Sequence, residues 1–294
     1  MSACPLCEAE NGNRAFEKAG FGYYRCARCR TLYVGLEMAD GEVHGHYRES
    51  YYESERQPAD ERQGYPSYRD SHTTLTDGFR KKLAVVRSHV PGGRLLDTGA
   101  AYGFFVKVAE PWFDASGIDI SEYAARIARE EFQAQVVQGD VEAIAAADAS
   151  FDAVVMWDII EHLIRPARAL QEICRVLKPG GFLFVSTDDA ACWLPRLLGR
   201  QWWALAAPLH LCHFSKQGLA LACDRVGLGV PAFQSDPREY TLAEVLKHFS
   251  VSYQSRALGG LAALLERAGL GKRVLRVARP EQFIAVIQKP LATA

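Results

Sequence analysis

The sequence predicts an α/β fold, a largely parallel sheet covered by helices, with a small metal-binding module at the N-terminus. Residues 95–105 have the pattern of a strand, a glycine loop and the start of a helix, and an acid follows 22 residues after Asp97. A glycine turn after a strand, with an acid about 20 residues further on, holds a nucleoside on an α/β sheet. Residues 178–181, Lys-Pro-Gly-Gly, end a helix just before an apolar strand. Two C-x2-C pairs predict the small module.

Length and composition fit a soluble protein with one large domain and one small domain. The chain has 294 residues and a formal net charge of −1, so no general attraction to nucleic acid is expected. No stretch of about 18 apolar residues indicates a membrane span, and the N-terminus lacks the apolar core of a signal peptide. We therefore expect no membrane span and a cytoplasmic location.

The four N-terminal cysteines form the pairs Cys4/Cys7 and Cys26/Cys29, with 18 residues between the pairs. This is the spacing of a zinc ribbon, in which four thiolates close a tetrahedral shell around a structural ion. Two disulfides or four free thiols are the alternatives, and a cytoplasmic location disfavours disulfides. The residues between the pairs are too few and too polar to form a core without a metal.

The glycine loop reads D-x-G-x-x-x-G, with Gly99, Ala101 and Gly103 at its key positions. It is not the dinucleotide fingerprint G-x-G-x-x-G, because its glycines have a different spacing and an acid directly precedes it. Glycine at such a loop permits a tight turn and lets the backbone approach a ligand.

Further elements follow the loop in an order that fits a single sheet. Apolar runs suited to burial on both faces predict the strands, and helical periodicity predicts the helices between them. The later strands are predicted at 136–140, 151–158, 182–187, 230–234 and 282–287. Helices are predicted at 75–90, 166–177 and 215–226, and 258–270 is a further apolar helical stretch.

Taken together, these motifs resemble those of class I S-adenosylmethionine-dependent methyltransferases. The loop is similar to their motif I, usually D-x-G-x-G-x-G, with Ala101 in place of the middle glycine. The helix end L-K-P-G-G before a strand is typical of the superfamily. Residues 199–203 and 208–215 resemble a bacterial subgroup that also carries an N-terminal zinc ribbon. The resemblance covers roughly residues 90–290 and implies a Rossmann-like seven-stranded sheet of order 3-2-1-4-5-7-6, with an antiparallel last strand.

This organisation predicts three parts: a zinc ribbon at 1–45, a helical linker or lid at 46–90, and a methyltransferase domain at 91–294. The large domain carries insertions at 188–214 and 237–281. The tyrosines of the linker either pack between ribbon and domain or form a lid over the site, as the segment before motif I does in related enzymes.

The resemblance also implies the cofactor, S-adenosylmethionine, and the residues that hold it. Ligands in open α/β sheets lie beyond the carboxyl ends of the strands. By family analogy Asp119 accepts hydrogen bonds from the ribose hydroxyls, and Asp140 contacts the adenine amino group. The predicted cofactor-binding residues are Asp97, Gly99, Ala101, Gly103, Asp119, Ile120, Asp140, Val141, Trp157 and Asp158.

Three histidines are the candidates for a catalytic base. An alcohol acceptor benefits from a base, and histidine suits that task near neutral pH. His162 directly follows the fourth strand beside Glu161, and a structural role near the cofactor is equally open for it. His210 and His213 lie in the first insertion, where the alternative is hydrogen bonding to the backbone.

The resulting hypothesis is O-methylation of a small molecule or a glycan. Sugar C-methyltransferases also carry such a ribbon, but they have an additional C-terminal domain, so C-methylation ranks lower. RNA methylation, with the ribbon binding RNA, is a second hypothesis, although nucleic acid is not the expected partner. A non-catalytic interaction protein is a third, disfavoured by the acids at 97, 119 and 140. The apolar face of 258–270 is expected to pack on the domain or on a second copy in a homodimer.

Overall fold

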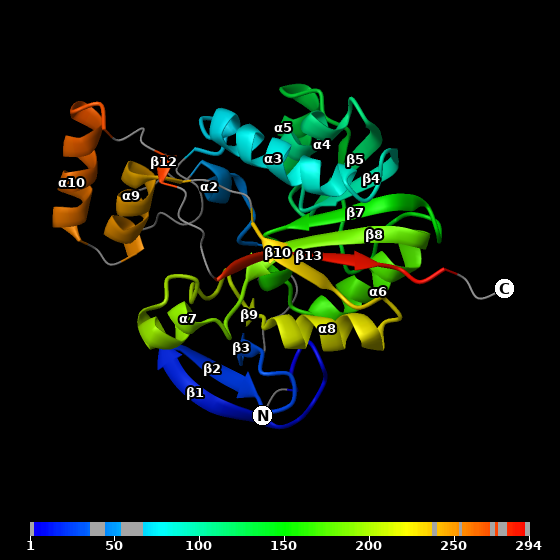
Figure 1. Ribbon diagram of the computed structural model, residues 1–294, viewed down its shortest axis with the longest axis horizontal. Helices are drawn as coiled ribbons and strands as arrows, with labels where there is room; N and C mark the ends of the chain where they lie inside the picture. Colours follow the sequence, from blue (N-terminus) through cyan, green and yellow to red (C-terminus); the bar gives the residue numbers. More distant parts are fainter. Residues whose placement is uncertain are drawn as a thin grey trace.

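The computed structural model describes residues 3–35, 45–53, 67–236, 240–252, 255–270, 274–275 and 281–291. Its centre is a seven-stranded sheet with the order β10-β13-β8-β7-β4-β5-β6 (Figure 1). The strands are β4 (Gly93–Thr98), β5 (Phe113–Asp119), β6 (Val136–Gln138), β7 (Phe151–Trp157), β8 (Leu177–Asp188), β10 (Ala232–Ser235) and β13 (Gln282–Gln288).

Numbered within this sheet, the strands have the predicted order 3-2-1-4-5-7-6. β4 pairs in parallel with β5 and β7, β5 with β6, and β7 with β8. β13 runs antiparallel to β8, and β10 runs antiparallel to β13. The predicted α/β fold with an antiparallel last strand is therefore confirmed.

Helices cover both faces of the sheet, because neighbouring strand residues point to opposite sides. Leu95 and Val155 pack with α3 (His72–Arg87), α4 (Phe104–Ala109) and α5 (Glu122–Glu130). Leu96 and Val154 pack on the other side with α6 (Pro166–Val176) and α8 (Lys216–Arg225). Both faces of the central strands are buried, as their continuous apolar runs predict (Figure 1).

The end of α6 differs in detail from the prediction. The helix ends at Val176 as expected, but β8 begins at Leu177 instead of residue 182. Leu177 pairs with Phe151, the next registered pair joins Phe182 and Ala153, and the residues between form a bulge. A bulge absorbs extra residues without ending the strand, so the Lys-Pro-Gly-Gly run belongs to the sheet.

The N-terminal residues 3–35, here called the cysteine module, form a second sheet of order β1-β2-β3-β9. β1 (Gly12–Lys18), β2 (Phe21–Cys26) and β3 (Leu32–Val34) belong to the module, whereas β9 (Cys212–His213) comes from the first predicted insertion. The module therefore shares a sheet with the large domain, which the sequence did not indicate. The predicted division at residue 45 stays a prediction, since 36–44 lie outside the described residues.

The remaining elements lie in the predicted segment 46–90, here called the lead-in, in the two insertions and, for η2, shortly after β7. Parts of the predicted segments 46–90 and 237–281 lie outside the described residues. α10 covers most of the predicted stretch 258–270, and within the described ranges no helix is both long and apolar enough to cross a membrane. These elements are α2 (Glu49–Tyr52), η2 (Ile160–His162), α7 (Trp193–Leu198), η3 (Gly199–Gln201), β11 (Tyr240–Thr241), α9 (Leu242–Ser252), α10 (Arg256–Arg267) and β12 (Val274–Leu275).

Candidate functional site

The glycine loop joins β4 to α4 at the carboxyl end of the parallel strands. Gly99 and Gly103 have φ angles of 72° and 74°, a region that glycine adopts without steric cost. A Cβ at Gly99 would collide with Ile159, and one at Gly103 would collide with Ala134. Both glycines are therefore required by backbone conformation and by close packing.

Ala101 occupies the position where the related motif has its middle glycine. Its φ of 48° lies in the left-handed region, which costs a residue with a Cβ roughly 1–2 kcal/mol. Its N–H donates to Asp119 Oδ2 at 2.7 Å, and this charge-assisted bond offsets the strain. The loop thus keeps the backbone path of the glycine motif without the glycine.

The two acids of the predicted motif lie close together beside this loop. Asp97 and Asp119 are 3% and 5% exposed. Burial, and then the charge of Asp119, hold the pKa of Asp97 well above its usual value. Burial also raises the pKa of Asp119, against the hydrogen bonds that its carboxylate accepts from the N–H groups of Ala101 and Ser121. Two buried carboxyls therefore lie next to each other beside the glycine loop.

The remaining residues predicted for the nucleoside lie at the ends of β5 and β6. Asp140 follows β6, and its Oδ1 accepts from the N–H of Glu142 at 2.8 Å. Val141 is buried and Ile120 is half-buried. Gln138 Nε2 donates to Ile120 O at 3.3 Å, which ties the two strand ends together at this edge.

Trp157 and Asp158 end β7 on the other side of the loop. Asp158 has a φ of 57° and is held by Ser186, whose hydroxyl donates to Asp158 Oδ1 at 3.0 Å and accepts from the Asp158 N–H at 3.1 Å. The Trp157 ring packs against Phe105, with centroids 5.5 Å apart. Backbone strain held by such bonds is typical of functional positions.

Lys82 of α3 was missed by the sequence reasoning. It is 1% exposed, and its Nζ donates to Ser186 Oγ at 2.9 Å and lies 3.4 Å from Asp158 Oδ2 and 3.6 Å from Asp236 Oδ2. It also stands 4.8 Å from the Trp157 ring centroid. The only available signal was a lysine at a buried position of the helix, and its partners lie on distant strands.

Glu161 is buried directly after β7, in η2. Its Oε2 accepts from Thr187 Oγ1 at 3.0 Å. Burial, and then the negative charge of Asp158, raise the pKa of Glu161 to about 8. A carboxyl with such a pKa exchanges protons near neutral pH, which is the property of a general base or acid.

His162 is held next to Glu161 by the first insertion and by the lead-in. Its Nδ1 lies 3.0 Å from Leu209 O and 2.9 Å from the Tyr47 hydroxyl. Because a carbonyl oxygen can only accept, Nδ1 carries the proton and the lone pair is on Nε2. Burial lowers the pKa of His162 to about 3, so the ring is neutral.

The three predicted histidines lie in one row, here called the histidine cluster (His162, His210 and His213). Ring centroids are 4.7 Å apart for the first pair and 6.2 Å apart for the second. His210 Nδ1 donates to Ala204 O at 2.8 Å. Burial lowers the pKa of both His210 and His213. The cluster is therefore uncharged, and which member touches a substrate stays a prediction.

Residues 45–53, the described start of the lead-in, contact residues on both sides of the predicted site. Tyr47 meets His162, and the buried Tyr52 donates its hydroxyl to Asp119 Oδ1 at 3.3 Å. Tyr102 in the glycine loop donates to Glu53 Oε1 at 3.0 Å. Residues 45–53 thus contact both the predicted cofactor half and the predicted acceptor half, and their role as a lid stays a prediction.

The four N-terminal cysteines are all buried and lie together. Their sulfur atoms are within 4.8 Å of one another, with 3.6 Å between Cys4 and Cys29 and 3.5 Å between Cys7 and Cys26. A zinc ion with Zn–S bonds of about 2.3 Å needs tetrahedral edges of about 3.8 Å. The donor set therefore fits a four-thiolate ion, whose charge would offset that of the sulfurs.

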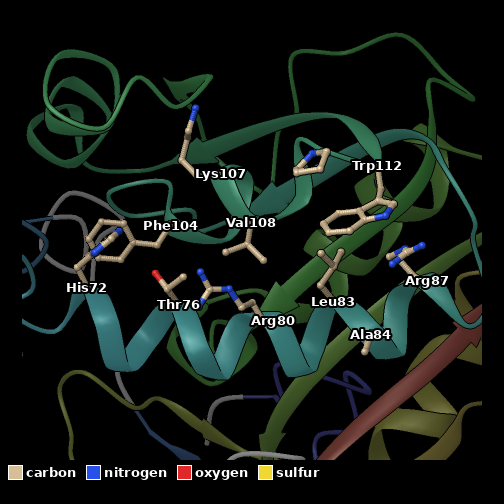
Figure 2. Close-up of a pocket in the computed structure, with 11 residues that line it drawn as sticks. His72, Thr76, Arg80, Leu83, Ala84, Arg87, Phe104, Lys107, Val108 and Trp112 are labelled. Carbon is tan, nitrogen blue, oxygen red and sulfur yellow. The ribbon is translucent and has the colours of Figure 1, made fainter.

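A separate groove of about 540 Å³ lies between α3 and α4. Figure 2 shows His72 and Phe104 at one end, and Trp112 with Arg87 at the other. The Arg87 guanidinium stands 4.4 Å from the Trp112 ring centroid. No predicted site residue lines this groove.

Comparisons with known proteins agree with this geometry. A family model described as a methyltransferase domain matches residues 69–231, more than half of the chain. The chain is 30% identical over 133 residues to a ubiquinone biosynthesis O-methyltransferase of Thiobacillus denitrificans, covering 42% of this chain and 57% of that protein. It spans between 33% and 57% of the length of the first curated relatives it matches.

Solved structures share the fold. One is a SAM-dependent methyltransferase from Archaeoglobus fulgidus, with a TM-score of 0.53 and 15% identity, covering 76% of this chain and 99% of that one. Another was solved in complex with the Haloferax volcanii Trm112 methyltransferase activator, with a TM-score of 0.55 and 16% identity, covering 77% and 96%. The family match includes the strand ends, the glycine loop and the acids described above. The chain therefore belongs to the methyltransferase-domain family, in the class I S-adenosylmethionine-dependent group.

Proposed function

We propose that the chain is a methyltransferase that transfers the methyl group of S-adenosylmethionine to an oxygen of a small molecule or glycan. The observation that carries the proposal is the Asp119 carboxylate, held at the carboxyl edge of the sheet by the N–H groups of Ala101 and Ser121. The oxygen acceptor is supported by the likeness to a ubiquinone biosynthesis O-methyltransferase. A small-molecule acceptor and a cytoplasmic location belong to the same proposal.

The cofactor residues have distinct proposed roles. The backbone of Gly99, Ala101 and Gly103 would face the nucleoside and methionine parts, where side chains would block approach. Asp119 would accept the ribose hydroxyls and Asp140 the adenine amino group. The other predicted residues would line the two flanks: Asp97, Ile120, Val141, Trp157 and Asp158.

S-adenosylmethionine supplies a methyl group that its sulfonium already activates. The chain's own task is to hold the acceptor oxygen in line, a contribution of roughly 7–11 kcal/mol, and to remove its proton. His162, the best placed of the three predicted histidines, is one candidate for the base. Glu161, with its raised pKa, is the other. A base of pKa near 8 would make turnover rise with pH through that value, whereas a base of pKa near 3 would not.

The cysteines Cys4, Cys7, Cys26 and Cys29 would hold one structural zinc ion. The sulfur separations of 3.5 and 3.6 Å support this assignment, as does the complete burial of the four side chains. Four ligands leave no open position, so the ion would take no part in the chemistry. Basic side chains of the cysteine module are offset locally, as in the Arg14–Glu17 pair, so RNA binding is not favoured.

The test begins with S-adenosylmethionine affinity, measured by calorimetry. Asp119→Ala should weaken binding at least about 100-fold, since two hydrogen bonds to a charged group contribute roughly 1.5–3 kcal/mol each. Asp114→Ala is the matched control, because Asp114 lies on the same strand with its side chain 81% exposed. Equal affinity of all three proteins would remove the ribose assignment.

The reaction itself is tested with methyl-labelled cofactor and acceptors that carry phenol, catechol or sugar hydroxyls. Label on an acceptor oxygen supports the proposal. Label on carbon or on RNA would select one of the competing hypotheses. The pH profile of Glu161→Gln against that of His162→Ala then identifies the base.

A further inference from the structure

The cysteine module is hydrogen-bonded to both ends of α8. Ser215, the N-cap of this helix, donates its hydroxyl to Cys29 O at 3.1 Å. At the other end Arg225 donates to Cys7 O and pairs with Glu8 at 2.6 Å. Each C-x2-C pair is thus bound through a backbone carbonyl, one to each end of the same helix.

Close backbone approach at the first of these contacts requires a glycine. A Cβ at Gly218 would lie 2.9 Å from Cys29 O and 2.9 Å from Thr31 Oγ1. A methyl group there would clash with a backbone oxygen, and this clash could not be relieved by a change of side-chain rotamer. Gly218 therefore marks a contact in which the module and the large domain fit tightly.

The module also continues into residues 199–215, here called the acceptor loop. Leu32 of β3 pairs with His213 of β9, and the Val34 N–H donates to Leu211 O at 2.9 Å. The N–H of Leu211 in turn donates to Glu161 O at 2.8 Å. The backbone of one residue, Leu211, therefore links the module to the turn that follows β7.

Side chains of the module pack against His213 of the histidine cluster and bind the backbone of the acceptor loop. Tyr23, fully buried, lies with its ring centroid 6.0 Å from that of His213, and its hydroxyl accepts from the Ala207 N–H at 3.3 Å. Trp202 of the acceptor loop is 1% exposed and lies 5.3 Å from His213. Lys18 Nζ donates to Trp202 O at 3.2 Å. His213 therefore lies among side chains of the module and of the acceptor loop.

We infer that the cysteine module is a positioning element of the acceptor half of the site, so that its four-cysteine centre sets the geometry of the acceptor loop and of the histidine cluster. The inference rests on the proposed function for the role of that half. The cofactor loop between β4 and α4 leads into α4, and α3, α4 and α5 lie on the face of the sheet opposite to the module (Figure 1).

Apart from the cysteines, buried side chains of the module such as Tyr23, Leu32 and Tyr33 lie in cores shared with the large domain, so the module depends on the ion to join its two C-x2-C turns. Removal of the ion should therefore release β3, then β9, and with them the acceptor loop. The parallel sheet should remain, because the core on its α3 face contains no residue of the module and the core on its α8 face consists mostly of residues from the sheet and its helices. The expected consequence is local loosening of one half of the site.

The test is amide hydrogen exchange on the full chain, zinc-loaded and after treatment with a chelator. Amides of 202–215 should exchange at least about tenfold faster after metal removal, the signature of a local opening. Amides of 93–119 should be unchanged, and S-adenosylmethionine affinity should change less than about twofold. Unchanged exchange in 202–215, or equal acceleration in both segments, would overturn the inference.

A substitution at Gly218 tests the contact between α8 and the module while the ion stays bound. Gly218→Ala should push Cys29 away and accelerate exchange in 202–215 with one zinc still bound. Gln217→Ala, an exposed position of the same helix, is the matched control and should change neither. Retained protection in Gly218→Ala would also contradict the inference. If S-adenosylmethionine does not bind at all, the proposed function fails while the exchange result on the module still stands.

Discussion

The free energy of unfolding of the wild-type protein should fall as pH rises because Glu161 ionises, and this fall should be absent in Glu161→Gln. The carboxyl is 8% exposed, beside Asp158 and the Thr187 hydroxyl. Its pKa is about 8 in the folded chain against a usual value of 4.5. Because the folded state binds this proton more tightly, the stabilisation is complete below pH 4.5 and is lost as pH rises through 8. Glutamine keeps the shape and cannot ionise.

The magnitude follows from the two pKa values. One proton bound in the folded state but not in the unfolded state changes the free energy of unfolding by about 1.4 kcal/mol per pH unit. Between pH 6.5 and pH 8, with partial titration near 8, the loss is about 1.6 kcal/mol. For a domain of this size that corresponds to a fall in Tm of roughly 3–6 °C. The pKa of His162 is lowered to about 3, so this residue reduces the stability of the protein only as pH falls below the ordinary histidine pKa of 6.5.

The assay is thermal and urea unfolding of the wild-type protein and Glu161→Gln at several pH values from 6.5 to 8. Other titrating groups cancel in the difference between the two proteins. Glu172→Gln is the matched control, because the hydrogen bond from Arg175 lowers the pKa of Glu172 and its effect belongs below about pH 4.5. Parallel pH curves for wild type and Glu161→Gln, with both proteins folded, would refute the burial argument.

Three further substitutions test other parts of the site. Ala101→Gly restores the usual glycine and relieves the φ of 48°, so unfolding in urea should show stability raised by up to about 1 kcal/mol; a clear loss would contradict the strain. Ser121→Ala removes the N-cap bond to the Ala124 N–H at 3.3 Å and should cost about 1 kcal/mol, with cofactor affinity as the second readout. Lys82→Met removes the buried ammonium next to Asp236, whose side chain is 2% exposed, and should cost about 3 kcal/mol or more in urea, and an unchanged midpoint would reject the role assigned to this lysine.

The strands could be predicted because their signals are local, whereas the order of the sheet came from the resemblance to the methyltransferase family. Apolar runs mark the strands, and glycine spacing marks the loop at 99 and 103. The element bounds were less predictable, as at β8, where a bulge keeps the Lys-Pro-Gly-Gly run inside the strand. Bulges depend on pairing with the neighbouring strand, which periodicity does not record.

The candidate site likewise contains residues that the sequence could predict and residues that it could not. The acids at 97 and 119 could be paired from sequence, since the carboxyl ends of neighbouring parallel strands meet at one edge. Lys82 could not be assigned, because its partner Ser186 is 104 residues away. That the three histidines form one row also depends on how the first insertion folds back onto η2.

By itself, then, the sequence determined the α/β class and the four-cysteine cluster, which depend on short-range patterns of residue type and spacing, and its motifs indicated the family, whose resemblance supplied the strand order. Only the tertiary structure decided that β9 completes the sheet of the cysteine module, that Ala101 takes the left-handed conformation of a glycine, and that burial leaves Glu161 with a pKa of about 8. The physical reason is that pairing between distant strands, backbone strain and desolvation are properties of the packed molecule and not of any one segment.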